Sequence, residues 1–182
     1  MESKKLSSLK YPIGQFNTPD NITSVQIKEW IISISAFPNT VKSLVDTIDT
    51  TQLNWRYRPN GWSIKQLVHH CTDSHLNSLC RFKLALTEDN PTIRPYYEDL
   101  WAELPDSLSD DISDALLILK GLHSKWTYLL KSLSEEELKR TFVHPESGDQ
   151  VTLAENIGIY AWHCDHHIAH IRLAMESGGE YD

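Results

Sequence analysis

The sequence predicts an all-α protein, an antiparallel four-helix bundle with long connections and with room for a short β-hairpin. Four segments carry apolar side chains at the three- and four-residue spacing of amphipathic helices. Polar stretches with proline and glycine separate these segments, and the chain contains no internal repeat. The 182 residues suffice for one domain, residues 1–182, with a single buried core. Helices that follow one another in this way usually pack as a bundle.

The first predicted helix begins near Thr23, after an irregular lead-in over residues 1–20. Apolar residues recur at helical spacing from there to Pro38. Proline lacks a backbone N–H and fixes φ, so we expect it to interrupt the helix and to begin a new one over Asn39–Ile48.

The second and fourth helices have clear starting signals. Ser63 is followed three residues later by Gln66, and Thr152 by Glu155. Both pairs fit a capping box, in which two side chains satisfy two orphan backbone N–H groups reciprocally. The second helix is expected to reach about Leu86. The fourth is expected to reach about Glu176, where Ser177-Gly178-Gly179 follows and glycine can adopt the left-handed cap conformation.

A third helix is expected from about Asp110 to Leu133, because its apolar residues alternate by four and three. A long connection through Glu88–Pro105 precedes it. The segment Thr141–Val151 has the turn residues of a short hairpin around Ser147-Gly148-Asp149, with a weak strand pattern on either side.

Composition argues against several classes of partner. The net charge is −8 and no block of Lys or Arg occurs, so neither nucleic acid nor an anionic membrane is expected to bind. No apolar run approaches the roughly 20 residues that a membrane span needs. The N-terminus lacks the apolar segment of a secretory signal. The three cysteines, Cys71, Cys80 and Cys164, are an odd number without CxxC spacing, which favours free thiols in the cytoplasm.

The histidines are clustered. Seven of the nine lie in two segments, 69–75 and 163–170. On a helix, residues four apart share a face, and two imidazoles at that spacing can bind one ion. The fourth helix offers two such pairs, His163 with His167 and His166 with His170. Spacing alone does not choose between them.

A third ligand from another helix would distinguish a bound ion from a loose surface pair. His70 shares a polar stripe of the second helix with Asp73 or Ser74 and with Asn77. His69 lies about 100° round the helix and is expected to be peripheral. Three imidazoles leave coordination positions for water or substrate, as in a catalytic metal site.

The other polar residues near these clusters have two interpretations each. His123 either orients a metal ligand or is an ordinary core histidine, and we favour the core. His166 and His170 either line the mouth of a pocket or are exposed, and the role of His75 stays open. Cys164 falls on the apolar track of its helix and is expected in the core. Asp73, Glu98 and Asp99 are all candidate proton acceptors, and no catalytic residue is assigned.

Nearly the whole chain resembles the DinB/YfiT-like family of four-helix-bundle metalloproteins, and within it the metal-dependent hydrolases of the YfiT type. The segments that carry the resemblance are YPIGQF (11–16), RPNGWSIKQLVHH (58–70), DSH (73–75), RFKLALTE (81–88), IRPY (93–96), HP (144–145), YAWH (160–163) and HHIAHI (166–171).

The resemblance implies one divalent metal ion per chain, zinc or nickel, bound by His70, His163 and His167. It also implies a homodimer in the cytoplasm that acts on a small molecule. The implied activity is hydrolysis by a metal-activated water. The alternative is a thiol S-transferase that activates a low-molecular-weight thiol such as bacillithiol, and a less favoured one is a non-catalytic metal-binding stress protein.

Overall fold

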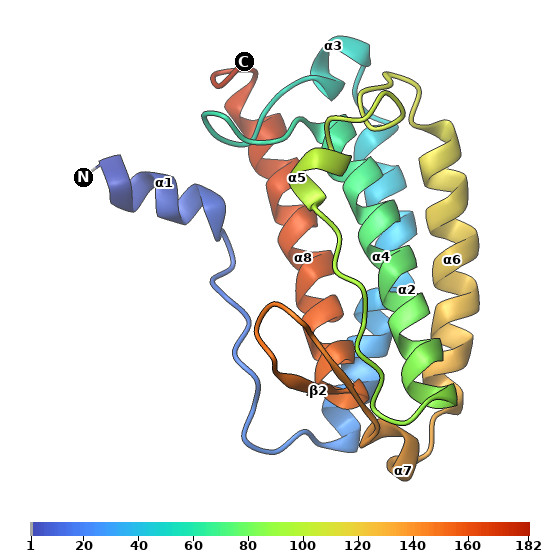
Figure 1. Ribbon diagram of the computed structural model, residues 1–182. Coiled ribbons are helices and arrows are strands. Elements are labelled where there is room, and N and C mark those ends of the chain that lie inside the picture. Colours follow the sequence, from blue (N-terminus) through green and yellow to red (C-terminus); the bar gives the residue numbers. More distant parts are fainter. Residues whose placement is uncertain (1) are drawn as a thin grey trace.

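Four long helices lie side by side in the computed structural model (Figure 1), and their apolar faces meet in one core. The structure describes residues 2–182. The long helices are α2 (Ser24–Val45), α4 (Ile64–Thr87), α6 (Ser113–Ser132) and α8 (Leu153–Ser177). The short elements are α1 (Glu2–Lys10), α3 (Thr50–Leu53), α5 (Glu98–Trp101), α7 (Glu135–Leu138), β1 (Thr141–Val143) and β2 (Gln150–Thr152). The predicted four-helix bundle is confirmed.

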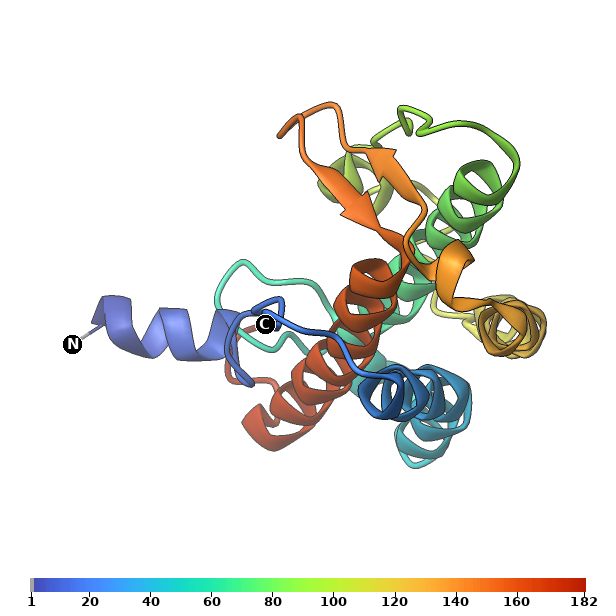
Figure 2. The ribbon, with the colours of Figure 1, turned by 90° about the horizontal axis from the view of Figure 1, so that it is seen from below.

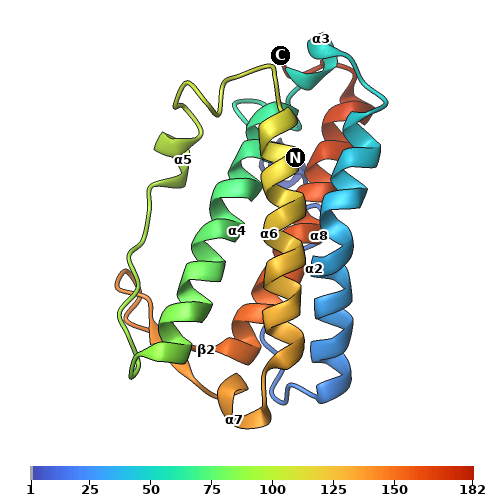
Figure 3. The same cartoon turned by 90° about the vertical axis from the view of Figure 1, so that its right-hand side faces the viewer.

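The helices do not simply alternate in direction along the chain. Neighbours α4 and α8 are antiparallel, as are α2 and α6, whereas α4 and α6 run the same way (Figures 1 and 3). Thr72 contacts Ala115 and His75 contacts His123, so residue numbers rise together along that pair. The reason is the long connection 88–112, which returns the chain to the end of the bundle where α4 began.

The predicted capping boxes both form. At the start of α4, the Gln66 N–H donates to Ser63 Oγ at 3.4 Å and the Ser63 N–H donates to Gln66 Oε1 at 3.0 Å. Thr152 and Glu155 make the same reciprocal pair at the start of α8. At the other end of α8, Gly178 has φ of +59°, the left-handed conformation expected there.

The expected interruption at Pro38 is wrong, because α2 runs unbroken through this residue. A proline inside a helix leaves the carbonyl four residues earlier without its helical donor. Here that carbonyl belongs to Ile34, and it accepts a hydrogen bond of 2.7 Å from Nδ1 of His123 on α6. The side chain thus replaces the bond that the proline removes, and the buried pyrrolidine ring packs in the core.

The ends of the bundle carry the smaller elements. The lead-in was expected to be irregular, but residues 2–10 form α1, which projects away from the bundle (Figure 2). The hairpin is confirmed, with β1 and β2 antiparallel and Phe142 opposite Val151. It is short because α8 begins immediately after β2, and it lies against the end of α4. No helix among residues 2–182 is long and apolar enough to cross a membrane.

The three thiols differ in accessibility, which gives a first prediction. Cys71 and Cys164 lie in the core, at 1% and 0% exposure, whereas Cys80 is exposed on α4. We expect 5,5′-dithiobis(2-nitrobenzoate) to modify one thiol per folded chain quickly and three after unfolding in urea. Cys80→Ser should leave no fast thiol. Rapid modification of two or three thiols in the folded protein would contradict this packing of α4 against α8.

Candidate metal centre

Three imidazole nitrogens from two helices converge on one point. Nε2 of His163 lies 3.1 Å from Nε2 of His167, one turn further along α8, and 3.3 Å from Nε2 of His70 on α4. Nitrogens that bind one zinc ion tetrahedrally at ~2.0–2.1 Å lie about 3.3 Å from one another. The antiparallel packing of α4 on α8 therefore produces the spacing of a three-histidine metal site. These residues could hold a metal ion.

A chain of hydrogen bonds determines which nitrogen of His163 carries its proton. The Ile34 carbonyl only accepts, so His123 Nδ1 donates to it, and His123 Nε2 is then the acceptor for His75 Nδ1–H at 2.7 Å. His75 Nε2 in turn accepts from His163 Nδ1–H at 3.0 Å. The lone pair of His163 is left on Nε2, the atom that faces the other two histidines. We call His75 and His123 the imidazole relay.

A second chain of the same kind orients His167. Nε2 of His170 donates to the carbonyl of Lys10, at the end of α1, at 3.1 Å. Nδ1 of His170 lies 3.4 Å from Nδ1 of His167 and accepts from it. The lone pair of His167 is therefore also on Nε2. The helix α1, which sequence patterns did not reveal, ends at the residue that anchors this second chain.

The two chains leave an arrangement of lone pairs that suits a cation. They leave lone pairs on Nε2 of His163 and of His167, which face each other at 3.1 Å. Neighbouring lone pairs repel, and a proton bound between them would be a buried charge. A divalent ion removes both the repulsion and the need for a proton, because the lone pair of each ring nitrogen then binds the ion. The donor set and its protonation thus fit the metal that this arrangement of histidines implies.

The surroundings keep these rings neutral. Burial, with a smaller contribution from His166, lowers the pKa of His70 to about 3. Burial also lowers the pKa values of His163 and His167 well below the usual range for histidine, and the neighbouring imidazoles add to the effect. Neutral imidazole is the form that binds metal, so the ligands need not lose a proton at neutral pH.

Acid should therefore destabilise the metal-free protein, and His123 allows a specific prediction. Burial lowers the pKa of His123 from 6.5 to about 4. Because the unfolded chain binds this proton more readily, the stabilisation is complete above about pH 6.5 and is lost as the pH falls towards 4. Inside this window, protonation of His123 lowers the free energy of unfolding by up to about 1.4 kcal/mol for each unit that the pH falls. Urea unfolding of wild type and His123→Gln between pH 7 and 5 tests this. The free energy of unfolding should fall less steeply with acid in His123→Gln, and an equal fall in both proteins would contradict the prediction.

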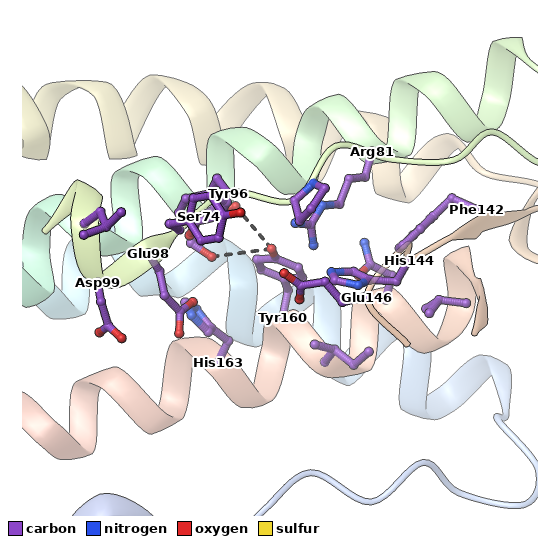
Figure 4. Close-up of a pocket in the computed structure, with 16 residues that line it drawn as sticks. Ser74, Arg81, Tyr96, Glu98, Asp99, Phe142, His144, Glu146, Tyr160 and His163 are labelled. Carbon is purple, nitrogen blue, oxygen red and sulfur yellow. Dashed lines mark hydrogen bonds between the residues drawn. The ribbon is translucent and has the colours of Figure 1, made fainter. Parts of the chain in front are cut away.

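Two cavities adjoin the candidate metal centre and share His163 in their linings. The larger, of about 660 Å³, runs along the groove between α4 and α8 and reaches His163 (Figure 4). The smaller, of about 340 Å³, is lined by all three candidate ligands. Glu98 and Asp99 line both cavities. The candidate metal centre is therefore open to a small molecule.

The three candidate proton acceptors are not equivalent. Glu98 and Asp99, on α5, border the cavities beside His163, whereas Asp73 lines neither. Burial, with smaller contributions from Asp99 and Glu146, raises the pKa of Glu98 above its usual value. Burial and Asp106 raise the pKa of Asp73 to about 6, away from the site. The geometry favours the α5 carboxylates.

Comparison with known proteins agrees with this arrangement. The family model of the DinB superfamily matches residues 34–171. The chain belongs to this superfamily. Other members include a "Putative metal-dependent hydrolase" of Bacillus cereus strain 03BB102, 52% identical over 167 residues that cover 91% of this chain and 95% of that protein. A protein of the same name from Bacillus anthracis strain A0248 is 51% identical over the same coverage.

Solved structures agree with the fold. YfiT from Bacillus subtilis, described as a probable metal-dependent hydrolase with an unusual four-helix bundle topology, superposes with a TM-score of 0.90 at 44% identity and covers 94% of this chain and 98% of its own. A mycothiol-dependent maleylpyruvate isomerase has a TM-score of 0.62 at 14% identity, covering 80% of this chain and 60% of its own. That likeness shows a shared DinB-type fold.

Within this member of the DinB superfamily, the other histidines have distinct positions. His166 and His170 are buried and line the smaller cavity, so the pocket interpretation was the better one. His69 is half-buried and lines neither cavity, as expected for a peripheral residue. The expectation that His123 is simply a core residue is incomplete, since it is buried and also hydrogen-bonds to His75.

A second set of side chains could also hold an ion: Cys71, His75 and His163. This set would use Nδ1 of His163, which already pairs with His75. It also needs a thiolate, and burial raises the pKa of the Cys71 thiol far above its usual value. The three-histidine set needs no such changes and is the stronger candidate.

Sequence reasoning offered His123 as a residue that could orient a ligand but favoured the core, and it did not connect His123 with His75. His75 is five residues from His70 and shares no helical face with it, and His123 is 48 residues further along. Only the packing of α2, α4 and α6 brings the two together. The one available signal was a histidine on the apolar seam of α6 near a proline on α2, and neither is specific by itself.

Proposed function

We propose that this protein is a metal-dependent hydrolase whose divalent ion is bound by His70, His163 and His167. The observation that carries the proposal is the convergence of three Nε2 atoms in a cavity that shares His163 with a second, larger one. The names of its close relatives support the same activity. A divalent ion bound there would act as a Lewis acid and lower the pKa of a bound water towards ~7.

The chain's own groups supply the rest of the chemistry. The imidazole relay and the chain through His170 hold His163 and His167 with their Nε2 lone pairs towards the position that the ion would occupy. Tyr160 donates to the Ser74 carbonyl at 3.2 Å and forms part of the larger cavity's floor, against which a substrate would lie (Figure 4). Glu98, beside His163 and with a raised pKa, is the group that accepts a proton during hydrolysis.

Esterase and amidase assays with nitrophenyl and nitroanilide substrates test the reaction class on the zinc- and nickel-loaded protein. We expect cleavage without any added thiol, loss of cleavage with His163→Ala, and retention with His69→Ala. The alternative is a thiol S-transferase. Metal-dependent consumption of monochlorobimane only in the presence of a low-molecular-weight thiol, with no thiol-independent cleavage, would replace the hydrolase proposal with that reaction.

The role of Glu98 gives a separate prediction. Glu98→Gln should lower kcat by about 100-fold or more, as removal of a general base commonly does, while metal content stays at one ion per chain. Asp73→Asn is the matched control, since Asp73 lies outside both cavities, and it should keep near wild-type kcat. An unchanged kcat in Glu98→Gln would show that another group accepts the proton.

A further inference from the structure

The larger cavity contains a cationic group that the proposed hydrolysis does not use. One wall of the cavity is α4, which contributes Ser74 and Arg81, and the opposite wall is α8, which contributes Asn156 and Tyr160. The segment before α5 and the β-hairpin cover it (Figure 4). Ser74 and Arg81 are seven residues apart, so they lie on one face of α4, two turns from each other.

Arg81 forms no ion pair within the part of the chain described, residues 2–182, although its charge lowers the pKa values of Glu98 and Tyr96 against the raising effect of burial. Its Nε atom is buried and has no hydrogen-bond acceptor. The ion pairs found among these residues involve other cations. Arg81 is half-buried, and a buried N–H without an acceptor costs free energy, so a ligand atom that accepts from Nε would be favoured. The guanidinium lines a cavity, where a carboxylate could accept two parallel hydrogen bonds from one of its edges.

Charges along the cavity are arranged asymmetrically. Glu98 and Asp99 lie at the His163 end, and Arg81 lies towards the opposite end with Phe142 and His144 (Figure 4). His70 and Arg81 are eleven residues apart on α4, which corresponds to about 16 Å along the helix. At the metal end the two carboxylates would offset the charge of a bound divalent ion, whereas the guanidinium has no ion-pair partner among residues 2–182 and attracts a carboxylate of the ligand.

We propose that the larger cavity binds an elongated small molecule with a carboxylate at the end remote from the metal centre, and that Arg81 binds this carboxylate. This inference rests on the proposed function for the position of the reacting group. It adds a substrate class, a carboxylic acid whose reactive bond lies several atoms from the acid. The apolar side chains of Val151 and Ile159 also line the cavity and would contact the apolar part of the ligand.

Glu146 provides a second variant that tests the same idea. This exposed residue of the hairpin loop lines the cavity and forms no ion pair with Arg81 in the described residues. Its negative charge repels a bound carboxylate and partly offsets the attraction of the guanidinium. Glu146→Gln should therefore strengthen carboxylate binding, the opposite direction from Arg81→Gln.

The test compares two probes that differ only at the remote end, 8-mercaptooctanoate and 8-mercaptooctan-1-ol. Their thiols bind a divalent ion, and their other ends carry a carboxylate or a neutral hydroxyl. Binding to the cobalt-loaded protein is followed by the absorbance of the cobalt–thiolate bond. Binding to the metal-free protein is followed by calorimetry. Wild type should prefer the carboxylate by about tenfold or more in both forms.

The variants decide the outcome. Arg81→Gln should abolish the preference and leave the alcohol's affinity unchanged, whereas Arg172→Gln, an exposed arginine on α8 that lines neither cavity, should keep it. Equal affinities of wild type for the two probes, or a preference that survives Arg81→Gln, would overturn the inference. Failure of the protein to bind cobalt would instead contradict the proposed metal centre, and the metal-free measurement would still decide the role of Arg81.

Discussion

Alanine at His70, His163 or His167 is expected to abolish stoichiometric metal binding. Each substitution removes one of three nitrogens that meet within hydrogen-bonding distance. Two remaining imidazoles make an incomplete site, so the loss should exceed the roughly 10- to 100-fold typical of removing a group that only supports a ligand. Metal content after dialysis against a weak chelator, measured by mass spectrometry, gives the result.

A matched control lies beside one of the ligands. His69 is the neighbour of His70 on α4 but lines neither cavity, so His69→Ala should keep one ion per chain. Circular dichroism would show that each variant folds. Full metal content in any of the three ligand variants, or its loss in His69→Ala, would contradict the assignment of ligands.

Breaking the imidazole relay should weaken metal binding without removing a ligand. His75→Leu deprives His163 Nδ1–H of its acceptor, which releases the constraint on the tautomer. We expect a 10- to 100-fold loss of affinity, about that reported for other groups that orient a metal-bound histidine. His123→Leu acts one step further away, through His75, and should cause a smaller loss.

Nitrogen NMR distinguishes this role from a merely structural one. In the metal-free wild type, His163 should be the tautomer protonated at Nδ1, and His75→Leu should give a mixture of tautomers. A folded His75→Leu protein with unchanged affinity, or a wild-type His163 protonated at Nε2, would show that the relay does not direct the lone pair.

Pro38 is linked to the same relay. Because it has no N–H, the Ile34 carbonyl is available to His123, and this bond determines the direction of every donor that follows up to His163. The feature that the sequence indicated as a helix break is therefore the origin of a hydrogen-bond chain that ends at the candidate metal centre. Local rules describe what a proline removes from a helix. They do not describe which side chain from another helix replaces it.

Much of the fold could be predicted because its signals are local. The capping boxes at Ser63 and Thr152 and the left-handed cap at Gly178 depend on residues within a few positions of one another. The direction of α6 relative to α4 could not be predicted in this way, because it depends on the path of residues 88–112. The helix α1 was missed because it has little apolar character and projects from the bundle.

The candidate site was predictable to a similar extent. The pair His163 and His167 follows from helical spacing, but the same spacing fits His166 and His170. The choice between them came from a resemblance, and the structure adds a physical reason. His163 and His167 direct Nε2 towards His70, while His170 lies behind His167 and donates to the Lys10 carbonyl. Spacing along one helix cannot show which pair faces another helix.

X-ray absorption spectroscopy of the zinc-loaded protein tests the central claim most directly, because it reports the identity and distance of the ligand atoms. We predict three imidazole nitrogens at ~2.0–2.1 Å, together with a light-atom ligand from solvent, and no sulfur. A sulfur neighbour at about 2.3 Å would place the ion at Cys71, His75 and His163 instead and would contradict the three-histidine centre.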